Sequence, residues 1–146
     1  MSGRTAAIWL LLLLVLGLGW QAQRSYHRLA ASRTLAVADA DLLAAARLGR
    51  APVQVFNANL AALETAMRAD PLEVGLPLTY GSYQLLLRHP EAARLSYLKA
   101  LGLEPRPEIY LNLGRALRAL GREDEARHYT DLALRLSPSL ASGKTK

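Results

Sequence analysis

An internal repeat is the feature that most constrains the fold of this 146-residue chain. Small and turn-forming residues recur at a common spacing of 33 positions, so that Gly81 falls on Gly114 and Pro105 falls on Pro138. The remaining matches are Ala93 with Ala126, Tyr97 with Thr130, Ala100 with Ala133 and Leu101 with Leu134. A repeat of this length is typical of proteins that stack one structural unit on the next. An ordinary helical bundle is the alternative, but it does not explain why these residues match at one spacing.

Each unit reads as two short helices. Proline and glycine divide the last copy into Pro107–Leu120 and Glu123–Leu136, with a turn at Gly121. The copy before it divides into a helix from Pro77 to about Leu87 and another that starts at Pro90. Leu and Ala dominate the composition, which favours helix over sheet because these side chains lose little freedom in a helix. The sequence therefore predicts an all-α fold.

The last copy resembles the tetratricopeptide repeat (TPR), whose pattern is W-x2-L-G-x2-Y, then A-x3-F, then Pro. Its places are filled here by Tyr110, Leu113, Gly114, Leu117, Ala126, Ala133 and Pro138. In the preceding copy they are filled by Tyr80, Gly81, Ala93, Tyr97, Ala100 and Pro105. The chain departs from the pattern at Thr130, Pro77 and Gln84. The resemblance implies a short α-solenoid of helical hairpins.

About three such units are needed, because each hairpin leaves an apolar face that only a neighbour can cover. We expect a TPR-like domain over residues 36–140, made of a degenerate repeat 36–71, a repeat 74–106 and a repeat 107–140. A helix with an apolar stripe at Val53, Phe56, Leu60, Leu63 and Met67 would be the second helix of the degenerate repeat. Residues 141–146 are expected to be a disordered tail.

The N-terminus carries an uncharged run over residues 6–20, flanked by Arg4 and Arg24. We interpret residues 1–22 as a signal-anchor, a single transmembrane helix with Trp20 at the membrane interface. A cleaved signal peptide is the competing interpretation. Cleavage requires small residues at −3 and −1, but a cut after Ala22 puts Trp20 at −3, and a cut after Gly19 puts glycine where alanine is preferred. A helical stalk over 23–35 would continue the anchor. Between Gln21 and Leu48 an apolar stripe recurs at helical spacing, at Tyr26, Leu29, Ala36, Val37, Ala40, Leu43 and Ala46.

The formal net charge is +6, and residues 1–50 carry six Arg against two Asp. This excess near the anchor favours contact with anionic lipid headgroups. Nucleic acid is not expected as a partner, because no basic face is interleaved with aromatic residues. We place the chain at the inner or plasma membrane, with its soluble domain on the exported, periplasmic side because the segment before the apolar run is very short. The opposite orientation stays open, since Arg24, Arg28 and Arg33 follow the apolar run and the positive-inside rule favours a cytoplasmic domain.

No arrangement of residues predicts an enzyme, a metal site or a cofactor site. The three histidines, His27, His89 and His128, lie on different elements without the spacing of metal ligands. The acidic run Glu123–Glu125 is expected in the first turn of a helix, where it opposes the positive end of the helix dipole. The chain has no cysteine, which excludes a thiol nucleophile and a disulfide framework.

The resemblance implies a concave groove lined by the first helix of each hairpin, where partners' peptides or helices are held. The matching positions are Leu78, Ser82, Leu85, Leu111, Asn112, Arg115 and Arg118. Asn112 can bond a peptide backbone, and the two arginines can pair with carboxylates; alternatively, both arginines form a solvated helix face. The carboxylate-gripping variant of the family is not expected, since Leu78 and Ser82 stand at its Lys and Asn positions.

The sequence thus predicts a membrane-anchored TPR-like adaptor that binds a protein partner and assembles or tethers an envelope-associated complex of a bacterial membrane. Two alternatives stay open. One is a structural accessory subunit of a larger membrane complex, and the other is an exported soluble binding protein after signal cleavage.

Overall fold

The structure is a computed structural model that describes residues 3–48 and 53–142. These residues form six α-helices and one short 3₁₀-helix. The helices are α1 (Gly3–Leu48), α2 (Val53–Ala69), α3 (Gly75–Leu86), α4 (Pro90–Leu103), α5 (Pro107–Ala119), α6 (Glu123–Leu136) and the 3₁₀-helix η1 (Pro138–Ser142). The all-α prediction is confirmed, and most predicted helix ends agree within two residues. Residues 49–52, where we expected a break between two helices, lie outside the described residues.

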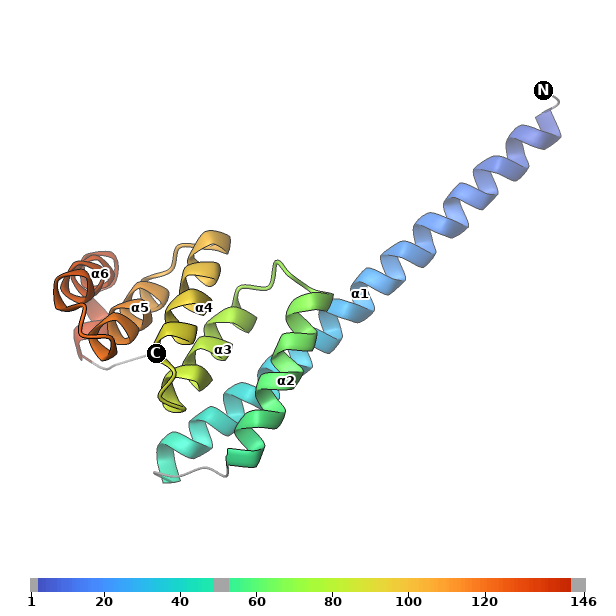
Figure 1. Cartoon of the computed structure of the whole chain (residues 1–146). Coiled ribbons are helices and arrows are strands. Elements are labelled where there is room, and N and C mark those ends of the chain that lie inside the picture. Colours follow the sequence, from blue (N-terminus) through green and yellow to red (C-terminus); the bar gives the residue numbers. More distant parts are fainter. Residues whose placement is uncertain (1–2, 49–52, 143–146) are drawn as a thin grey trace.

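The helices stack as three successive pairs, α1 with α2, α3 with α4, and α5 with α6 (Figure 1). Each helix packs against the next along the chain, and α3 also contacts both α1 and α5. The first helices of the pairs therefore form one row. The N-terminal half of α1 extends far beyond the stack as a single straight helix.

One hydrophobic cluster joins the second and third pairs. Its buried residues are Val74, Ala93, Tyr97, Ala100, Ile109, Leu113, Ala116, Leu117 and Ala126. Tyr97 is the large residue on α4, and its side chain is 1% exposed. Small residues bring α5 and α6 close together: a Cβ built on Gly114 would lie 2.6 Å from Thr130 Oγ1 and 3.0 Å from the Ala126 carbonyl oxygen. This close approach is what the repeated small residues predict.

A second cluster joins α1, α2 and α3. It comprises Ala31, Ala38, Phe56, Leu63, Ala66, Leu76 and Tyr83. Phe56 and Tyr83 meet edge to face with ring centroids 4.9 Å apart. Tyr83 therefore supplies the large side chain of α3, next to Gln84, which stands at the expected aromatic position. Pro77, at the other departure from the pattern, is fully buried in the first turn of α3.

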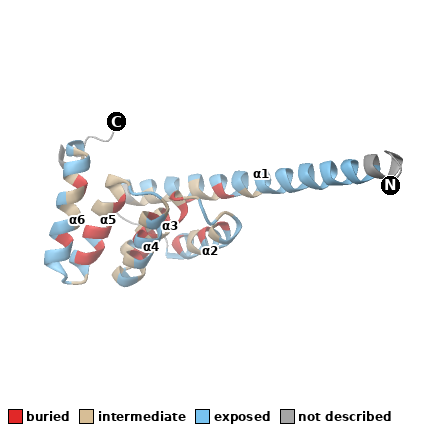
Figure 2. Ribbon diagram, turned by 90° about the horizontal axis from the view of Figure 1, so that it is seen from above, coloured by how far each residue is buried: buried red, intermediate tan, exposed pale blue. Residues whose placement is uncertain are grey.

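The structure confirms that residues 21–48 are helical, but it places the predicted stripe, from Tyr26 to Leu43, on the side of α1 that faces solvent. Tyr26, Leu29 and Val37 are 70%, 52% and 58% exposed. Figure 2 shows that most of α1 is exposed, with buried positions only where it lies beside the other helices. The face that packs on α2 and α3 carries Ala31 and Ala38, with Leu35, Leu42 and Ala45 beside them. Alanine gives a weak periodic signal, so the bulkier exposed residues dominated the pattern. Packing also begins at Ala31, inside the segment expected to be a stalk.

The C-terminal end differs slightly from the expectation. Pro138, predicted to end the last helix, begins η1, which runs to Ser142 and contacts α6. The first two residues of the predicted tail thus belong to this turn. Residues 143–146 lie outside the described residues.

Candidate partner groove

The seven predicted groove residues occupy one face each of α3 and α5. Leu78, Ser82 and Leu85 recur at helical spacing on α3, and all three are half-buried. Leu78 and Leu85 pack against the cluster between the second and third pairs. Leu111 and Asn112 are half-buried on α5, whereas Arg115 and Arg118 are exposed. The two helices contact each other in the row of first helices.

A polar group of residues lies where these two faces meet. The Tyr97 hydroxyl, reaching in from α4, donates a hydrogen bond to Ser82 Oγ at 3.3 Å. Ser82 Oγ in turn donates to the Leu78 carbonyl oxygen at 3.1 Å. Burial raises the pKa of the Tyr97 phenol above its ordinary value of 10.0, and the Ser82 hydrogen bond and the positive charge of Arg115 oppose that rise. Ser82, Tyr97 and Arg115 therefore belong to one neighbourhood.

The α5 side of this neighbourhood is preorganised. Arg115 Nη1 donates to Asn112 Oδ1 at 3.0 Å, which holds the guanidinium along the helix. Arg118 lies one turn further on, where its Nε is 3.8 Å from a carboxylate oxygen of Glu123 on α6. Arg118 thus stands at the end of the groove, next to the α5–α6 turn, and shares its charge with Glu123. Of the two arginines, Arg115 is held by Asn112 on α5, whereas Arg118 is paired with Glu123 of α6.

The residues of the repeat pattern are mainly packing residues in the structure. Ala93, Ala100, Ala126 and Ala133 have no exposed surface. Tyr110 stacks on Tyr129 with centroids 6.2 Å apart. Tyr80 is half-buried and donates its hydroxyl to Glu64 at 2.8 Å. Pro105 lies in the connection between α4 and α5, and Pro138 begins η1.

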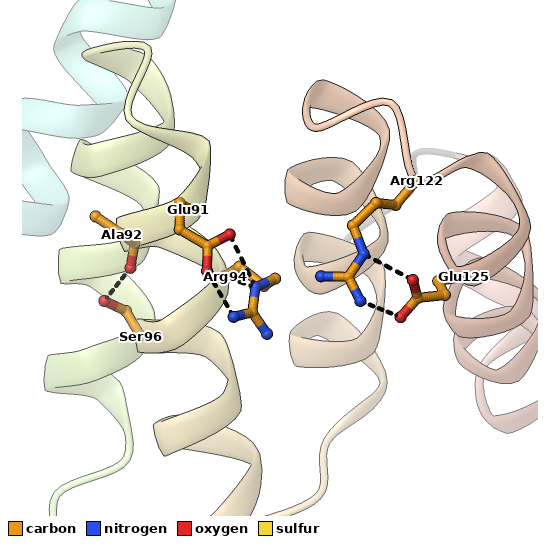
Figure 3. A network of polar contacts seen from close by, with 6 residues as sticks. All are labelled: Glu91, Ala92, Arg94, Ser96, Arg122 and Glu125. Carbon is orange, nitrogen blue, oxygen red and sulfur yellow. Dashed lines mark hydrogen bonds and ion pairs between the residues drawn. The ribbon is translucent and has the colours of Figure 1, made fainter.

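The second helices carry an outer charged surface. Figure 3 shows Glu91 paired with Arg94 on α4 at 2.6 Å and Arg122 paired with Glu125 at the start of α6 at 2.7 Å. The side chains of Arg94 and Arg122 point into the space between the two elements. Hydrogen bonds from Arg94 lower the pKa of the Glu91 carboxyl. All four charges are satisfied locally, as expected of a solvated face.

The acidic run and the histidines have structural partners. Glu123, Asp124 and Glu125 lie in the first turn of α6, as predicted, and Asp124 pairs with Arg127. His89 Nδ1 lies 3.0 Å from Gln84 Oε1, and His128 meets the ring of Tyr129 edge to face. Within residues 3–48 and 53–142, no group of three or more His, Asp or Glu is placed to hold a metal ion.

Sequence reasoning assigned no groove residue to α1. Thr79 Oγ1 donates to Asp39 Oδ1 at 2.7 Å, which joins α3 to α1 in the row of first helices. Nearby, Asn59 Nδ2 donates to both Asp41 Oδ2 and the Tyr83 hydroxyl, at 2.7 and 2.8 Å. These contacts join residues 18 to 40 positions apart, so no local pattern indicates them.

Several cavities lie along α1, away from the predicted groove. One, of about 570 Å³, runs between α1 and α2 and is lined mainly by alanines, including Ala30, Ala62 and Ala69. Another, of about 330 Å³, lies between α1 and the α2–α3 connection, beside Trp20, Arg24 and Leu72. Both cavities therefore lie beside α1, the helix that carries the apolar N-terminal segment.

The repeat is identifiable by comparison. The family model for the tetratricopeptide repeat matches residues 107–140, the last copy. No curated protein matches the chain in sequence. Solved structures, however, share its fold.

The second TPR of Spaghetti (RPAP3), bound to the HSP90 peptide SRMEEVD, is similar with a TM-score of 0.66 and 18% identity, over 80% of this chain and 99% of that one. A thermophilic TPR protein from Thermus thermophilus is similar with a TM-score of 0.63 and 27% identity, over 86% and 69%. MamA gives 0.62 and 19%, over 77% of this chain, which spans only 61% of MamA. The chain therefore carries a tetratricopeptide repeat at residues 107–140 and has a fold similar to that of these TPR structures.

Proposed function

We propose that the chain is a membrane-anchored TPR adaptor, which holds a protein partner at a bacterial inner membrane and helps assemble an envelope-associated complex. The observation that carries this proposal is the continuity of α1. The helix runs unbroken from an apolar segment into the packed core of the repeats.

The apolar segment supports the anchor. Every residue from Ile8 to Trp20 is exposed, and the large ones are 47–68% exposed. Such a continuous apolar surface has a high cost in water unless a membrane or partner covers it. Among the described residues, α1 is the single helix long and apolar enough to span a membrane. An N-terminal signal sequence has the same properties, so the mature N-terminus must be determined.

The α3–α5 face supports the partner site. It presents half-buried apolar side chains beside a held guanidinium, an arrangement that suits an extended peptide or helix with at least one carboxylate. The Spaghetti repeat demonstrates that this fold can hold a short acidic peptide. Leu78 and Ser82 stand where the family's carboxylate-gripping variant has Lys and Asn, so the α3 side of this groove is less basic than in that variant. We therefore infer a partner segment that is more apolar than the peptides that variant binds.

The decisive experiment is purification of the full chain in mild detergent, followed by identification of co-purifying proteins. Arg115→Glu combined with Arg118→Glu should abolish the association, because the charge that meets the partner's carboxylate is reversed. Arg68→Glu with Arg135→Glu is the matched control, since these exposed arginines lie on the second helices α2 and α6. Association unchanged by the first pair overturns the groove assignment.

The anchor is tested separately. Alkaline carbonate should leave the chain in the membrane fraction, and N-terminal sequencing should find residues 6–20 intact. Release by carbonate, or a mature N-terminus beginning at Trp20 or Gln23, supports the exported soluble protein instead. A cysteine-reactive, membrane-impermeant label on an introduced exposed cysteine would establish whether the repeats lie on the periplasmic side.

The accessory-subunit alternative rests on one specific observation. Beyond Trp20, α1 exposes Tyr26, Leu29, Val37 and Leu43 on a face that its own repeats leave uncovered. A neighbouring subunit that packs there would make the chain a structural member of a larger complex. Tyr26→Ser with Leu29→Ser should then release it from that complex while the Arg115 and Arg118 changes have no effect.

A further inference from the structure

The cavity of about 330 Å³ between α1 and the α2–α3 connection is lined by both charged and apolar side chains. On one side lie Trp20, Arg24 and Arg28 of α1, and on the other side lie Asp70 and Leu72 of the α2–α3 connection. Trp20 is the last residue of the apolar run 6–20, so the cavity begins where the apolar segment ends. Helix α2 thus carries the chain back toward that segment before α3 begins (Figure 1).

The positions along α1 match the layers of a bilayer. With a rise of ~1.5 Å per residue, Arg24 lies ~6 Å and Arg28 ~12 Å beyond Trp20. The headgroup layer on each side of the hydrocarbon is about 5–7 Å thick. If Trp20 marks the interface, the Arg24 backbone lies at the level of the lipid phosphates, and the Arg28 backbone lies ~5 Å outside the headgroup layer, from which its long side chain reaches back. The Arg24 guanidinium also lies 5.6 Å from the centre of the Trp20 ring, which keeps it next to the interface.

The α2–α3 connection lies at the same level because it lines the same cavity. Leu72 is 69% exposed there, without cover from the repeats. The neighbouring Glu73 carboxylate accepts a hydrogen bond from the Gly75 amide at 3.1 Å, so it is engaged at the start of α3. Asp70 is therefore the carboxylate that lines the cavity together with the two arginines.

We propose that this cavity binds the headgroup of a membrane phospholipid, with the phosphate on Arg24 and Arg28 and with Leu72 inserted at the interface. The proposal rests on the membrane anchor proposed above and adds a second membrane contact to it. Asp70 favours a headgroup that carries an amine as well as a phosphate, since an ammonium group pairs with its carboxylate, whereas a purely anionic headgroup has no group to offer it.

The absence of cysteine makes a depth measurement direct, because one introduced thiol is unique. The full chain with Leu72→Cys carries a nitroxide label and is reconstituted into vesicles of phosphatidylethanolamine, phosphatidylglycerol and phosphatidylcholine. We expect the label to lie at headgroup depth by its relative accessibility to oxygen and to a water-soluble nickel chelate. Leu95→Cys, on an exposed site of α4, is the control and should be fully aqueous.

A label at Leu13→Cys separates the two proposals. If it is also aqueous, the anchor itself fails. If it lies in hydrocarbon while the Leu72 label is aqueous, the anchor stands and the headgroup site is overturned.

Lipid retention tests the chemistry of the site. Native mass spectrometry of the full chain, released from these vesicles in detergent, should show bound phosphatidylethanolamine in preference to phosphatidylglycerol. Arg24→Gln with Arg28→Gln should reduce total bound lipid several-fold, and Asp70→Asn should abolish the preference. Arg94→Gln with Arg135→Gln, on the second helices, is the control. Lipid binding unaffected by the Arg24 and Arg28 changes overturns the proposal.

Discussion

The α-carbon of Gly81 lies directly against the ring of Tyr97. A Cβ built at this position would be 2.6 Å from Tyr97 Cε1 and 2.9 Å from Cδ1. Gly114 has the same relationship to Thr130, the residue that matches Tyr97 in the last copy. The two hairpins therefore use one geometry with different side chains, and the close approach of their helices depends on glycine in both.

Gly81→Ala should destabilise the fold. The added methyl displaces a ring that is 1% exposed and surrounded by the cluster between the second and third pairs, and overpacking of this kind typically costs about 1–3 kcal/mol. Chemical denaturation followed by helical circular dichroism, with the chain in detergent, measures the change. Gly102→Ala is the control: nothing lies within 4 Å of its added Cβ, so this change should be neutral or stabilise by up to about 1 kcal/mol. Equal effects at the two sites would contradict the packing argument.

Gly114→Ala should be destabilising for two separable reasons. The new methyl meets the Thr130 hydroxyl at 2.6 Å and the Ala126 carbonyl oxygen at 3.0 Å. Adding Thr130→Ala removes the first contact but leaves the second, since the carbonyl belongs to the backbone of α6. We expect the double variant to recover part of the lost free energy of unfolding, and full recovery would show that the backbone contact is unimportant.

Tyr83→Phe should lower the free energy of unfolding, because it removes hydrogen bonds that connect α3 to α1 and α2. The Tyr83 hydroxyl donates to the Ala38 carbonyl oxygen at 2.7 Å and accepts from Asn59, and its loss leaves both groups without this partner. Asn59 keeps its hydrogen bond to Asp41 and the Ala38 carbonyl lies within α1, so the expected cost is that of lost hydrogen bonds, about 0.5–1.5 kcal/mol each. Tyr80→Phe removes only an exposed hydrogen bond to Glu64 and should have a smaller effect. Denaturation midpoints of both variants decide the comparison.

Stability should fall at alkaline pH because of Tyr97. In the unfolded chain its phenol ionises at about 10, whereas burial raises the pKa in the folded protein. Between these two values the folded state keeps a proton that the unfolded state loses, so the free energy of unfolding decreases as pH rises above 10. Tyr97→Phe should therefore reduce the slope of stability against pH above 10. Denaturation of both proteins at a series of pH values around 10 measures the two slopes, and equal slopes would contradict the role given to Tyr97.

The repeat spacing was sufficient to predict the helical hairpins. Proline and glycine give local signals, and Pro90, Pro107 and Glu123 begin helices where the sequence indicates. The buried alanines and the close approaches at Gly81 and Gly114 follow from the same repeat. The membership of the last copy in the TPR family was likewise predictable from its residues.

The first hairpin was less predictable, because its packed face on α1 consists largely of alanine. The helical stripe that begins at Tyr26 and Leu29 is apolar and periodic, yet it faces solvent. A periodic pattern identifies a helix with an apolar face, but it does not show whether the same chain covers that face. The hydrogen bonds of Asp39 and Asn59 depend on helices that meet only in three dimensions. The roles of Arg115 and Asn112 toward a partner stay a prediction.

Because α1 is one helix from the apolar segment to the repeats, it also fixes the direction in which the repeats face around the axis of α1. Each residue inserted between Trp20 and Ala31 would turn the stack by about 100° and move it ~1.5 Å along the axis, since a helix has 3.6 residues per turn. One added residue would thus point the groove in another direction, whereas seven would nearly restore its direction and lift it ~10 Å. The number of residues between Trp20 and Ala31 therefore fixes both the distance of the repeats from the apolar segment and the direction in which they face.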